Sequence, residues 1–382
     1  MSKTYGVGVM GAGNISAAYL KLAPLFKGLE LRAVADMVPD AAKRRADEFG
    51  IAAQTPDELL KNSEIDVIVN LTVPAAHYQV SMDAISAGKH AYSEKPFVLT
   101  VEQGNALKAA AAQRNLRVGS APDTFFGAAH QQARAVLDSG KVGRIASGTT
   151  HVMGRGMEHW HPNPEFFFQP GAGPLLDMGP YYVTNLVQLI GPVKRVTAFS
   201  GMARPERIVS TPNVAATGSR IKVNTPTTIH GILEFANGAI VTIGASWDVF
   251  GHGHHNIELY GTEGSLFVPD PNFFGGELTV ADKSGAREKI EPWSHPFGTP
   301  NYTDSSGNTR ANYRAAGLAD MMASIQQNRP ARCGLDNALH VIDVLTSLLR
   351  AGASGEVITL TTTCERPAAL GPEEAKALLK AA

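Results

Sequence analysis

The sequence has little cysteine, no long apolar run and almost no net charge. Its two cysteines, Cys333 and Cys364, lie far apart without a metal-type spacing, so no disulfide framework is expected. No apolar run approaches the roughly 20 residues that a membrane-spanning helix needs. The formal net charge of -1 gives no reason to expect nucleic acid or a membrane surface as a partner.

The first residues, Met1 to Tyr5, lead directly into a strand-like segment and do not form the apolar stretch of a signal peptide. We therefore expect a cytoplasmic protein. What the sequence does contain is a hydrophobic fraction of 44% over 382 residues. A chain of this length and composition is expected to fold as two globular domains, because single cores stop growing at about 250 to 300 residues.

Short apolar runs alternate with helical patterns over the first third of the chain. This alternation predicts parallel strands joined by right-handed crossovers, and strands so rich in Val, Ile and Ala are expected to be buried on both faces. We predict an α/β domain over residues 1–124. Its expected strands are 5–10, 29–35, 66–71, 90–93 and 117–119, and its expected helices are 14–25, 40–49, 75–87 and 101–113.

The pattern changes after about residue 124, and we predict an α+β domain over residues 125–382 with a large open, mostly antiparallel sheet. Residues 193–280 are predominantly β in pattern, with Gly261-Thr262-Glu263-Gly264 as a tight hairpin turn. A long surface connection is expected at 292–309. The expected helices are 127–139, one beginning near Tyr181, 313–327 and 337–351, and the Ala-rich tail is expected to end helically.

A glycine-rich turn follows the first strand. Gly11 permits a tight turn, Gly13 lets the backbone approach a pyrophosphate, and Ser16 is small enough for close packing of helix on strand. The N-terminus of the following helix offers free N–H groups to phosphates. Asp36 ends the second strand about 20 residues later, where an acid binds a ribose diol. These features predict a Rossmann domain that binds a dinucleotide; the alternative is a plain turn with a helix-capping acid.

The residues around Asp36 bear on which dinucleotide is bound. No arginine directly follows Asp36, which favours NAD over NADP, because a 2′-phosphate needs a basic partner. Lys43, Arg44 and Arg45 lie a little further on, so NADP stays open.

Two further motifs follow in order behind this turn. They are Ser93-Glu94-Lys95-Pro96-Phe97 and Gly171-Ala172-Gly173-Pro174-Leu175-Leu176-Asp177-Met178-Gly179-Pro180-Tyr181. With them, the chain resembles the Gfo/Idh/MocA oxidoreductase family, which includes glucose–fructose oxidoreductase and inositol dehydrogenases. The likeness covers nearly the whole chain and includes Pro74, His77 and residues 257–268. It implies a nicotinamide-dependent enzyme.

The resemblance also implies roles for single residues. Lys95 corresponds to the catalytic lysine, Asp177 to a substrate-orienting acid and Tyr181 to the acid/base. Most family members carry His where this chain has Tyr181, whereas glucose–fructose oxidoreductase carries Tyr. The family's Trp-Arg pair is Trp160-His161 here, so the Trp carries over and the Arg contact is in doubt. A cis peptide bond before Pro96 is typical of the family and would aim Lys95.

The glycine motif and the resemblance together imply a set of cofactor contacts. They are Gly11, Gly13, Asn14, Ile15, Asp36, Thr72, Pro74, His77, Glu94, Lys95 and Trp160.

Oxidation of a secondary alcohol needs a hydride acceptor, which the nicotinamide supplies, and a group that removes the hydroxyl proton. Tyr181 can remove it if its pKa, near 10 unperturbed, falls toward neutrality beside a cation such as Lys95. On a helix, Asp177 and Tyr181 would share one face because they are four residues apart. Taken singly, Asp177 could instead cap a helix with Pro180 near its first position, Lys95 could be solvated, and Tyr181 could be a packing residue.

Other polar residues are candidates for substrate binding. His159 and His161 flank Trp160 in a loop that is expected to face the cofactor domain, where they could bind hydroxyls. Asp123, at the end of the first domain, is another candidate; its plainer interpretation is a turn acid. A second group, His252, His254 and His255, could suggest a metal, but no carboxylate or thiolate is evident nearby, and we predict no metal.

Three functions compete at this point. The first is an NAD(P)-dependent dehydrogenase acting on a sugar, glycoside or cyclitol, and the absence of an arginine cluster favours a neutral polyol. The second is a redox-neutral, NAD-dependent glycosidase that oxidises a ring hydroxyl transiently, eliminates the aglycone and returns the hydride. The third is a non-catalytic NAD-binding regulator. The large β surface of the second domain suggests sheet-face packing into a homodimer or homotetramer.

Overall fold

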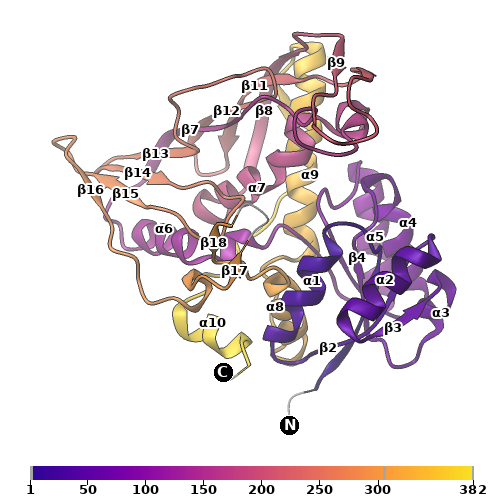
Figure 1. Cartoon of the computed structure of the whole chain (residues 1–382). Coiled ribbons are helices and arrows are strands. Elements are labelled where there is room, and N and C mark those ends of the chain that lie inside the picture. Colours follow the sequence, from indigo (N-terminus) through magenta and orange to yellow (C-terminus); the bar gives the residue numbers. More distant parts are fainter. Residues whose placement is uncertain (1–2, 304–306, 381–382) are drawn as a thin grey trace.

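The computed structural model of the chain describes residues 3–303 and 307–380 (Figure 1). Its N-terminal part holds a six-stranded sheet in the order β3-β2-β1-β4-β5-β6, and all neighbouring strands are parallel. The strands are β1 (Tyr5–Met10), β2 (Leu29–Ala35), β3 (Ala52–Gln54), β4 (Val67–Asn70), β5 (His90–Ser93) and β6 (Val118–Ser120). The predicted α/β fold is confirmed, and β1 is buried along its whole length.

Helices cover both faces of this sheet. One face packs against α1 (Ser16–Leu22) and α2 (Pro39–Phe49), and the other against α3 (Pro56–Lys61), α4 (His77–Ser86) and α5 (Val101–Gln113). The sequence prediction lacks β3 and α3. The strand β3 has no buried side chain and therefore no apolar pattern, but Thr55 and Glu58 form a capping box that marks the start of α3.

A second sheet of nine strands follows in the order β16-β15-β14-β13-β7-β12-β11-β8-β19. Every neighbouring pair is antiparallel except β7 and β12, so the prediction of a large, mostly antiparallel sheet is confirmed. The strands are β7 (Ile145–Met153), β8 (Val193–Gly201), β11 (Thr228–Phe235), β12 (Ile240–Ser246), β13 (Ile257–Gly261), β14 (Ser265–Val268), β15 (Thr279–Ala281), β16 (Arg287–Lys289) and β19 (Ile358–Thr359).

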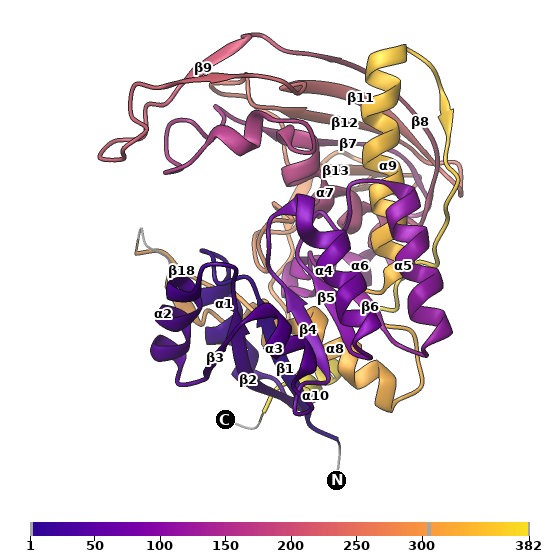
Figure 2. The same ribbon diagram turned by 90° about the vertical axis from the view of Figure 1, so that its right-hand side faces the viewer.

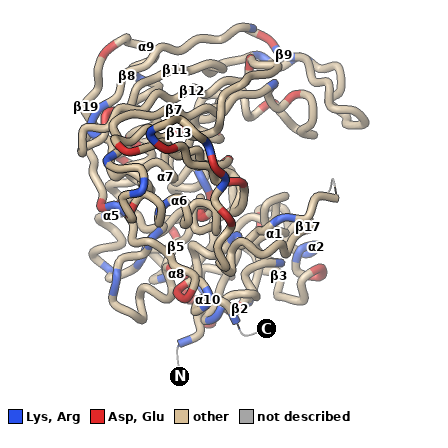
Figure 3. The backbone as a smooth tube through the Cα atoms, turned by 90° about the vertical axis from the view of Figure 1, so that its left-hand side faces the viewer, with Lys and Arg blue, Asp and Glu red and all other residues tan. Residues whose placement is uncertain are grey.

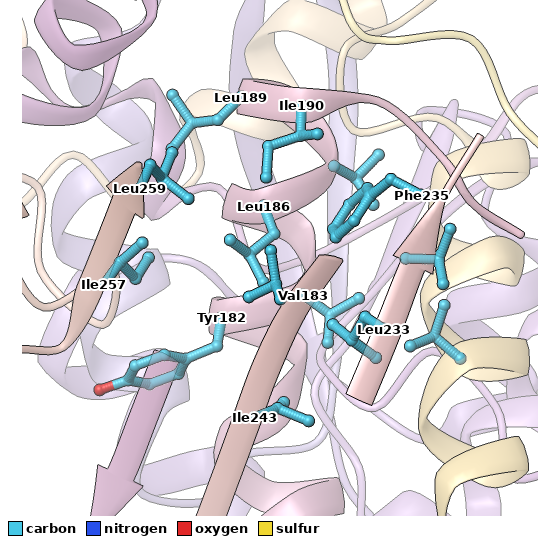
Figure 4. Close-up of a cluster of buried hydrophobic side chains, with 14 of the residues drawn as sticks. Tyr182, Val183, Leu186, Leu189, Ile190, Leu233, Phe235, Ile243, Ile257 and Leu259 are labelled. Carbon is cyan, nitrogen blue, oxygen red and sulfur yellow. The ribbon is translucent and has the colours of Figure 1, made fainter. Parts of the chain in front are cut away.

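Two long helices, α7 (Gly173–Ile190) and α9 (Leu335–Ser354), cover one face of the second sheet together with α6 (Ala128–Asp138). Figure 4 shows Tyr182, Val183, Leu186, Leu189 and Ile190 of α7 pointing into the core. The facing strands contribute Leu233, Phe235, Ile243, Ile257 and Leu259. Among the described residues, Figure 2 shows no helix on the opposite face of this sheet.

The chain returns to the first sheet near its C-terminal end. Buried side chains of α8 (Ala316–Gln326) and α10 (Pro372–Leu378) belong to the same apolar cluster as those of β1 and α1. A boundary near residue 124 therefore separates the two sheets but not all the helices that cover them, and the domain limits stay a prediction.

The connections follow the expected turn chemistry. The Gly261 N–H donates to the Gly264 carbonyl over 2.8 Å and joins β13 to β14, as predicted. The connection expected at 292–309 contains two short strands, β17 (Tyr302–Thr303) and β18 (Thr309–Arg310), and its residues 304–306 lie outside the described part. In residues 3–303 and 307–380 no helix is long and apolar enough to cross a membrane.

Candidate active site

Lys95 lies two residues beyond the carboxyl end of β5 and reaches across to α7. Its Nζ atom is 2.9 Å from Asp177 Oδ1 and 2.8 Å from the Asp177 carbonyl oxygen. Burial opposes the positive charge, but Asp177, Tyr181 and Glu94 more than offset this effect and raise the pKa of Lys95 above its usual value. Lys95 is therefore a firmly charged lysine that binds the opposite domain.

The helix that carries Asp177 starts earlier than expected. We predicted a start near Tyr181, and the alternative interpretation of Asp177 as a cap put Pro180 near the first position. Instead α7 begins at Gly173 with Pro174 in its first turn, and Pro180 lies inside the helix. The prediction was wrong because Gly171-Ala172-Gly173 reads as a turn, whereas Pro174 is the true start signal. Asp177 is therefore not a helix cap, and it shares a helix face with Tyr181.

Tyr181 lies beside the lysine, with Lys95 Nζ 5.2 Å from the centre of its ring. The expectation that a cation brings the phenol toward neutrality is not met. Burial raises the pKa of Tyr181 above its usual value, and the two cations Lys95 and Arg314 offset this only in part. The phenol is consequently protonated at neutral pH in the free protein.

Arg314 is a second cation at this site, and the sequence reasoning missed it. Its charge acts most strongly on Tyr181 and then on Glu94, and these partners raise the pKa of the arginine in spite of burial. The backbone that aims it is constrained: the Arg314 N–H donates to Asn312 Oδ1, and Ala315 has a φ of +82°. An alanine rarely adopts this left-handed conformation, which is typical of functional positions.

Two residues of the first domain hold the lysine segment in place. Glu94 accepts hydrogen bonds from the Tyr19 hydroxyl and from the Lys95 N–H, each over 2.9 Å. The buried ring of His77 lies 2.7 Å from the Pro96 carbonyl oxygen and 3.0 Å from that of Thr72. The peptide bond before Pro96 is cis, as the resemblance implies. His77 thus supports the loops of the site from beneath.

A cavity of about 280 Å³ opens between these groups. Both domains contribute to it: the glycine-turn helix, the loops after β4 and β5, the loop before α7, and α7 itself. Its walls are Ile15, Thr72, Pro74, Glu94, Lys95, Pro96, Phe166, Phe167, Gly171, Ala172, Leu176, Asp177 and Tyr181. Lys95, Asp177 and Tyr181, predicted as a catalytic set, are thereby brought together with four of the predicted cofactor contacts.

The glycine turn fits a dinucleotide. Gly11 has a φ of +104°, and a side chain there would meet Leu71 and Thr72 backbone atoms within 3 Å. At Gly13, by contrast, a β-carbon would meet nothing within 4 Å, which leaves open space beside the helix N-terminus for a pyrophosphate. The Ser16 hydroxyl donates to the Gly13 carbonyl over 2.6 Å, and this bond closes the turn.

The residues beyond β2 and β4 fit the adenosine end of the same cofactor. Asp36 accepts the Ala12 N–H over 2.7 Å, so its carboxylate lies beside the glycine turn. Met37, Val38 and Val73 are exposed by 85%, 56% and 66%, so their apolar surface is open to a ligand that binds here. Asn14, also a predicted contact, is exposed in the turn.

Two of the basic residues that left NADP open as a cofactor form ion pairs with acidic residues. Lys43 pairs with Asp47 over 3.1 Å, and Arg45 pairs with Glu48 over 2.6 Å. Arg45 also lies 3.2 Å from the Ser16 hydroxyl, close to the glycine turn.

The remaining predicted site residues lie apart from this cavity wall. Trp160 is 55% exposed and packs edge-on against His161, which in turn contacts Phe167 of the cavity. The Asp177 carboxylate is close enough to His161 to act on its pKa, although burial lowers that pKa overall. His159 lines a different cavity.

Asp123, predicted as a substrate contact, is only 1% exposed and accepts the Gly317 N–H over 3.0 Å. Burial raises the pKa of this carboxyl to about 6. It does not line the cavity, but it interacts electrostatically with Arg314, as Tyr181 does.

The predicted histidine loop lies on the second sheet, away from the cavity. The ring of His254 stacks on that of His151 with centroids 3.9 Å apart, and His252 lies beside it. Across the described ranges no cluster of three or more His, Cys, Asp or Glu is arranged to hold a metal ion.

Comparison with known families gives the same assignment for both halves of the chain. Residues 5–121 match the model of an oxidoreductase family with an NAD-binding Rossmann fold, and residues 130–267 match the GFO/IDH/MocA C-terminal domain. The chain belongs to the GFO/IDH/MocA oxidoreductase family. It is therefore an NAD-binding oxidoreductase, as the glycine turn and the motif around Lys95 predicted.

Relatives and solved structures agree with this family. The chain is 27% identical over 320 residues to levoglucosan dehydrogenase of Pseudarthrobacter phenanthrenivorans. The aligned region covers 77% of this chain and 80% of the relative. It is 26% identical over 264 residues to scyllo-inositol 2-dehydrogenase (NAD(+)) of Bacillus subtilis, covering 68% and 72%. The solved apo form of levoglucosan dehydrogenase superposes with a TM-score of 0.79 at 21% identity over 95% of this chain and all of that one.

Proposed function

We propose that this GFO/IDH/MocA protein is an NAD-dependent dehydrogenase that oxidises a secondary hydroxyl of a neutral sugar, glycoside or cyclitol. When bound, NAD supplies the hydride acceptor. The observation that carries the proposal is the contact of Lys95 with Asp177 beside Tyr181 at the wall of one cavity. The sugar or cyclitol class is supported by the relatives named above, and by a cavity wall that offers hydrogen-bonding groups next to aromatic rings.

The hydrogen-bonding positions that Lys95 and Asp177 leave unused suit a substrate hydroxyl. An ammonium has three donors, and Asp177 takes two of them, so one N–H of Lys95 is left for the substrate oxygen. Within the described residues, Asp177 Oδ2 receives no hydrogen bond and can accept one from a neighbouring hydroxyl. A vicinal diol fits this pair of groups, because one hydroxyl can accept from Lys95 while the next donates to Asp177.

Tyr181 exchanges the proton of the reacting hydroxyl. Because its pKa is raised, the phenol acts readily as an acid when a ketone is reduced, and as a base only at alkaline pH. Lys95 and Arg314 favour the phenolate, so both cations work in the direction of alcohol oxidation.

The test is a substrate survey with purified protein and NAD, read as NADH formation. Levoglucosan, myo-inositol, scyllo-inositol, glucose and methyl glucosides represent the proposed class, and glycerol and lactate serve as small-alcohol controls. At least one cyclic polyol is expected to give NADH with a kcat/KM well above that of the controls. If no member of the class yields NADH at any pH from 7 to 10, the proposal is wrong.

The same samples separate the dehydrogenase from the redox-neutral glycosidase. Denatured protein is analysed for released nucleotide, and glycoside cleavage is measured without added NAD. A dehydrogenase releases little NAD and needs it in the assay. Stoichiometric retained NAD, together with aglycone release and no NADH, would favour the glycosidase.

We further propose a homodimer formed through the uncovered face of the second sheet. Phe199, Ile232 and Ile240 point from β8, β11 and β12 to this face and are exposed by 77%, 44% and 50%. β12 carries no charged residue and β11 only Glu234, as the mostly tan tube in Figure 3 shows. Analytical ultracentrifugation is expected to show a dimer that the variant Ile232→Asp disrupts. A wild-type monomer would contradict this.

A further inference from the structure

A second cavity, of about 250 Å³, lies at the end of the second sheet, beyond the carboxyl ends of β7 and β12 and beside the short strand β9 (Glu206–Ile208). Figure 2 shows where β9 lies relative to this sheet. None of its wall residues lines the catalytic cavity. The partition between the two includes the rings of Phe167 and Trp247, whose centres are 5.9 Å apart.

The inner wall of this second cavity is an ion-paired group. Arg207 is 3% exposed and lies 2.9 Å from Glu158, and it also pairs with Asp248. Both acids are thereby engaged by one arginine. A third acid at the wall, Glu206, pairs with Arg220 over 2.8 Å.

The outer wall carries two further arginines. Arg155 and Arg204 hold their guanidinium groups 5.9 and 5.7 Å from the ring centre of Phe250. Neither has an acidic partner within 4.0 Å in the described part of the chain. The ring itself is 73% exposed. Two cations are therefore held at the mouth of the cavity, while every acid of the wall is already paired.

Three buried polar atoms at the same cavity are incompletely bonded. Glu158 Oε2, Arg207 Nε and His159 Nδ1 have no hydrogen-bond partner among the described residues. Buried polar atoms in folded proteins nearly always have a partner, so such a cluster is typical of a wall that water or a ligand completes. One acceptor, one donor and one imidazole nitrogen together match hydroxyl groups, which both donate and accept.

We propose that this cavity is a second, non-catalytic binding site for a sugar-sized polyol that carries a carboxylate or a phosphate. The oxyanion pairs with Arg155 and Arg204, because guanidinium groups bind carboxylate and phosphate oxygens in paired hydrogen bonds. The hydroxyl-bearing part faces the inner wall, where buried water or side-chain adjustment links it to the incompletely bonded atoms. The cavity has room for one monosaccharide unit. This site stands independently of the dehydrogenase activity proposed above.

The site shares a loop with the catalytic cavity. This loop is the connection between β7 and α7, which contributes Glu158 to one cavity and Phe167 to the other. The Thr211 hydroxyl lies 3.2 Å from the Glu158 carbonyl oxygen and 2.9 Å from the His161 carbonyl oxygen, so one side chain contacts both ends of its segment 158–161. A ligand at the second site would therefore order the loop that carries Trp160 and His161. Its binding is expected to leave the chemistry at Lys95 unchanged.

The experiment is calorimetric titration of the full-length protein saturated with NADH, so that the phosphate-binding glycine turn is occupied. The probes are D-glucuronate and D-glucose 6-phosphate, with D-glucose and inorganic phosphate as half-ligands that carry only hydroxyls or only the oxyanion. At least one of the two complete probes is expected to bind more tightly than both half-ligands. The probe that binds more tightly shows whether the site prefers a carboxylate or a phosphate.

Variants locate the site. Arg155→Gln with Arg204→Gln is expected to weaken the sugar anion at least about tenfold, the effect of one lost charge-assisted hydrogen bond. Arg144→Gln, at an exposed arginine near the start of β7, is the matched control and should change nothing. The proposal is overturned if no complete probe binds, if glucose binds as well as its anionic derivatives, or if the double variant binds normally. It is also overturned if the double variant alters the oligomeric state and not ligand affinity, because the cavity is then a subunit contact.

Discussion

The Nζ atom of Lys95 lies 2.9 Å from a carboxylate oxygen of Asp177 and 2.8 Å from the carbonyl oxygen of the same residue. This one contact joins the Rossmann domain to the long helix of the second domain. It also fixes the direction of the remaining N–H of the ammonium, and the catalytic proposal depends on it.

Removing the charge of Asp177 should disable this arrangement. In Asp177→Asn, the buried ammonium loses the partner that contributes most to its raised pKa, so Lys95 is less firmly charged and less well oriented. We expect kcat/KM to fall by about 10²-fold or more, with NADH affinity retained. Steady-state kinetics and fluorescence titration measure the two quantities. Asp57→Asn, at an exposed acid of α3, is the control, and an equal loss in both variants would argue against a specific role.

Arg314 should tune the proton exchange at Tyr181. Because its charge lowers the pKa of the phenol, Arg314→Met is expected to move the alkaline limb of the oxidation profile to higher pH and to slow oxidation near pH 8 by about tenfold. Arg314→Lys keeps the charge and should restore the profile in part. An unshifted profile in the Met variant would mean that the arginine serves only the fold.

Asp123 should make stability depend on pH. Its pKa is raised to about 6 from 3.8, so its protonated form favours the folded state; this contribution is complete below about pH 3.8 and is lost as the pH rises through 6. Asp123→Asn removes the titration. The free energy of unfolding of the variant, taken relative to that of wild type, should be higher at pH 8 than at pH 4.5 by on the order of 2 kcal/mol. Urea unfolding at both pH values measures this, and a pH-independent difference would refute it.

Asp36 should set the cofactor preference. Its carboxylate lies beside the glycine turn, where it can bind a ribose diol and repel a 2′-phosphate. Asp36→Ser is expected to raise the KM for NAD about tenfold or more and to lower that for NADP. Asp40→Ser, four residues on, is the control. If the variant keeps the wild-type ratio of the two KM values, Arg45 or another group decides the preference.

Much of the fold could be predicted from the sequence because its signals are local. Gly11, Gly13 and Asp36 each mark a fixed place in a strand-turn-helix unit, and alternation of apolar residues marks most strands. The short strand β3 has no such signal because its side chains are exposed. The start of α7 was missed because the Pro174 signal follows directly on Gly171 and Gly173, which favour a turn.

The site residues likewise include some that the sequence predicts and one that it does not. Lys95, Asp177 and Tyr181 stand in motifs, but Arg314 follows Tyr181 by more than a hundred residues and belongs to no motif. Only the return of the chain to the first sheet brings it to the phenol. The raised pKa of Tyr181 could not be predicted either, because it depends on how completely the ring is buried, and burial follows from packing of both domains.

The most direct test of the whole account is the activity of Lys95→Ala measured beside its affinity for NADH. We expect kcat/KM for the best cyclic polyol to fall by about 10³-fold or more, because the residue that orients the substrate oxygen is gone, while NADH binds within a few-fold of wild type. Undiminished turnover in this variant would contradict the assignment of the active site.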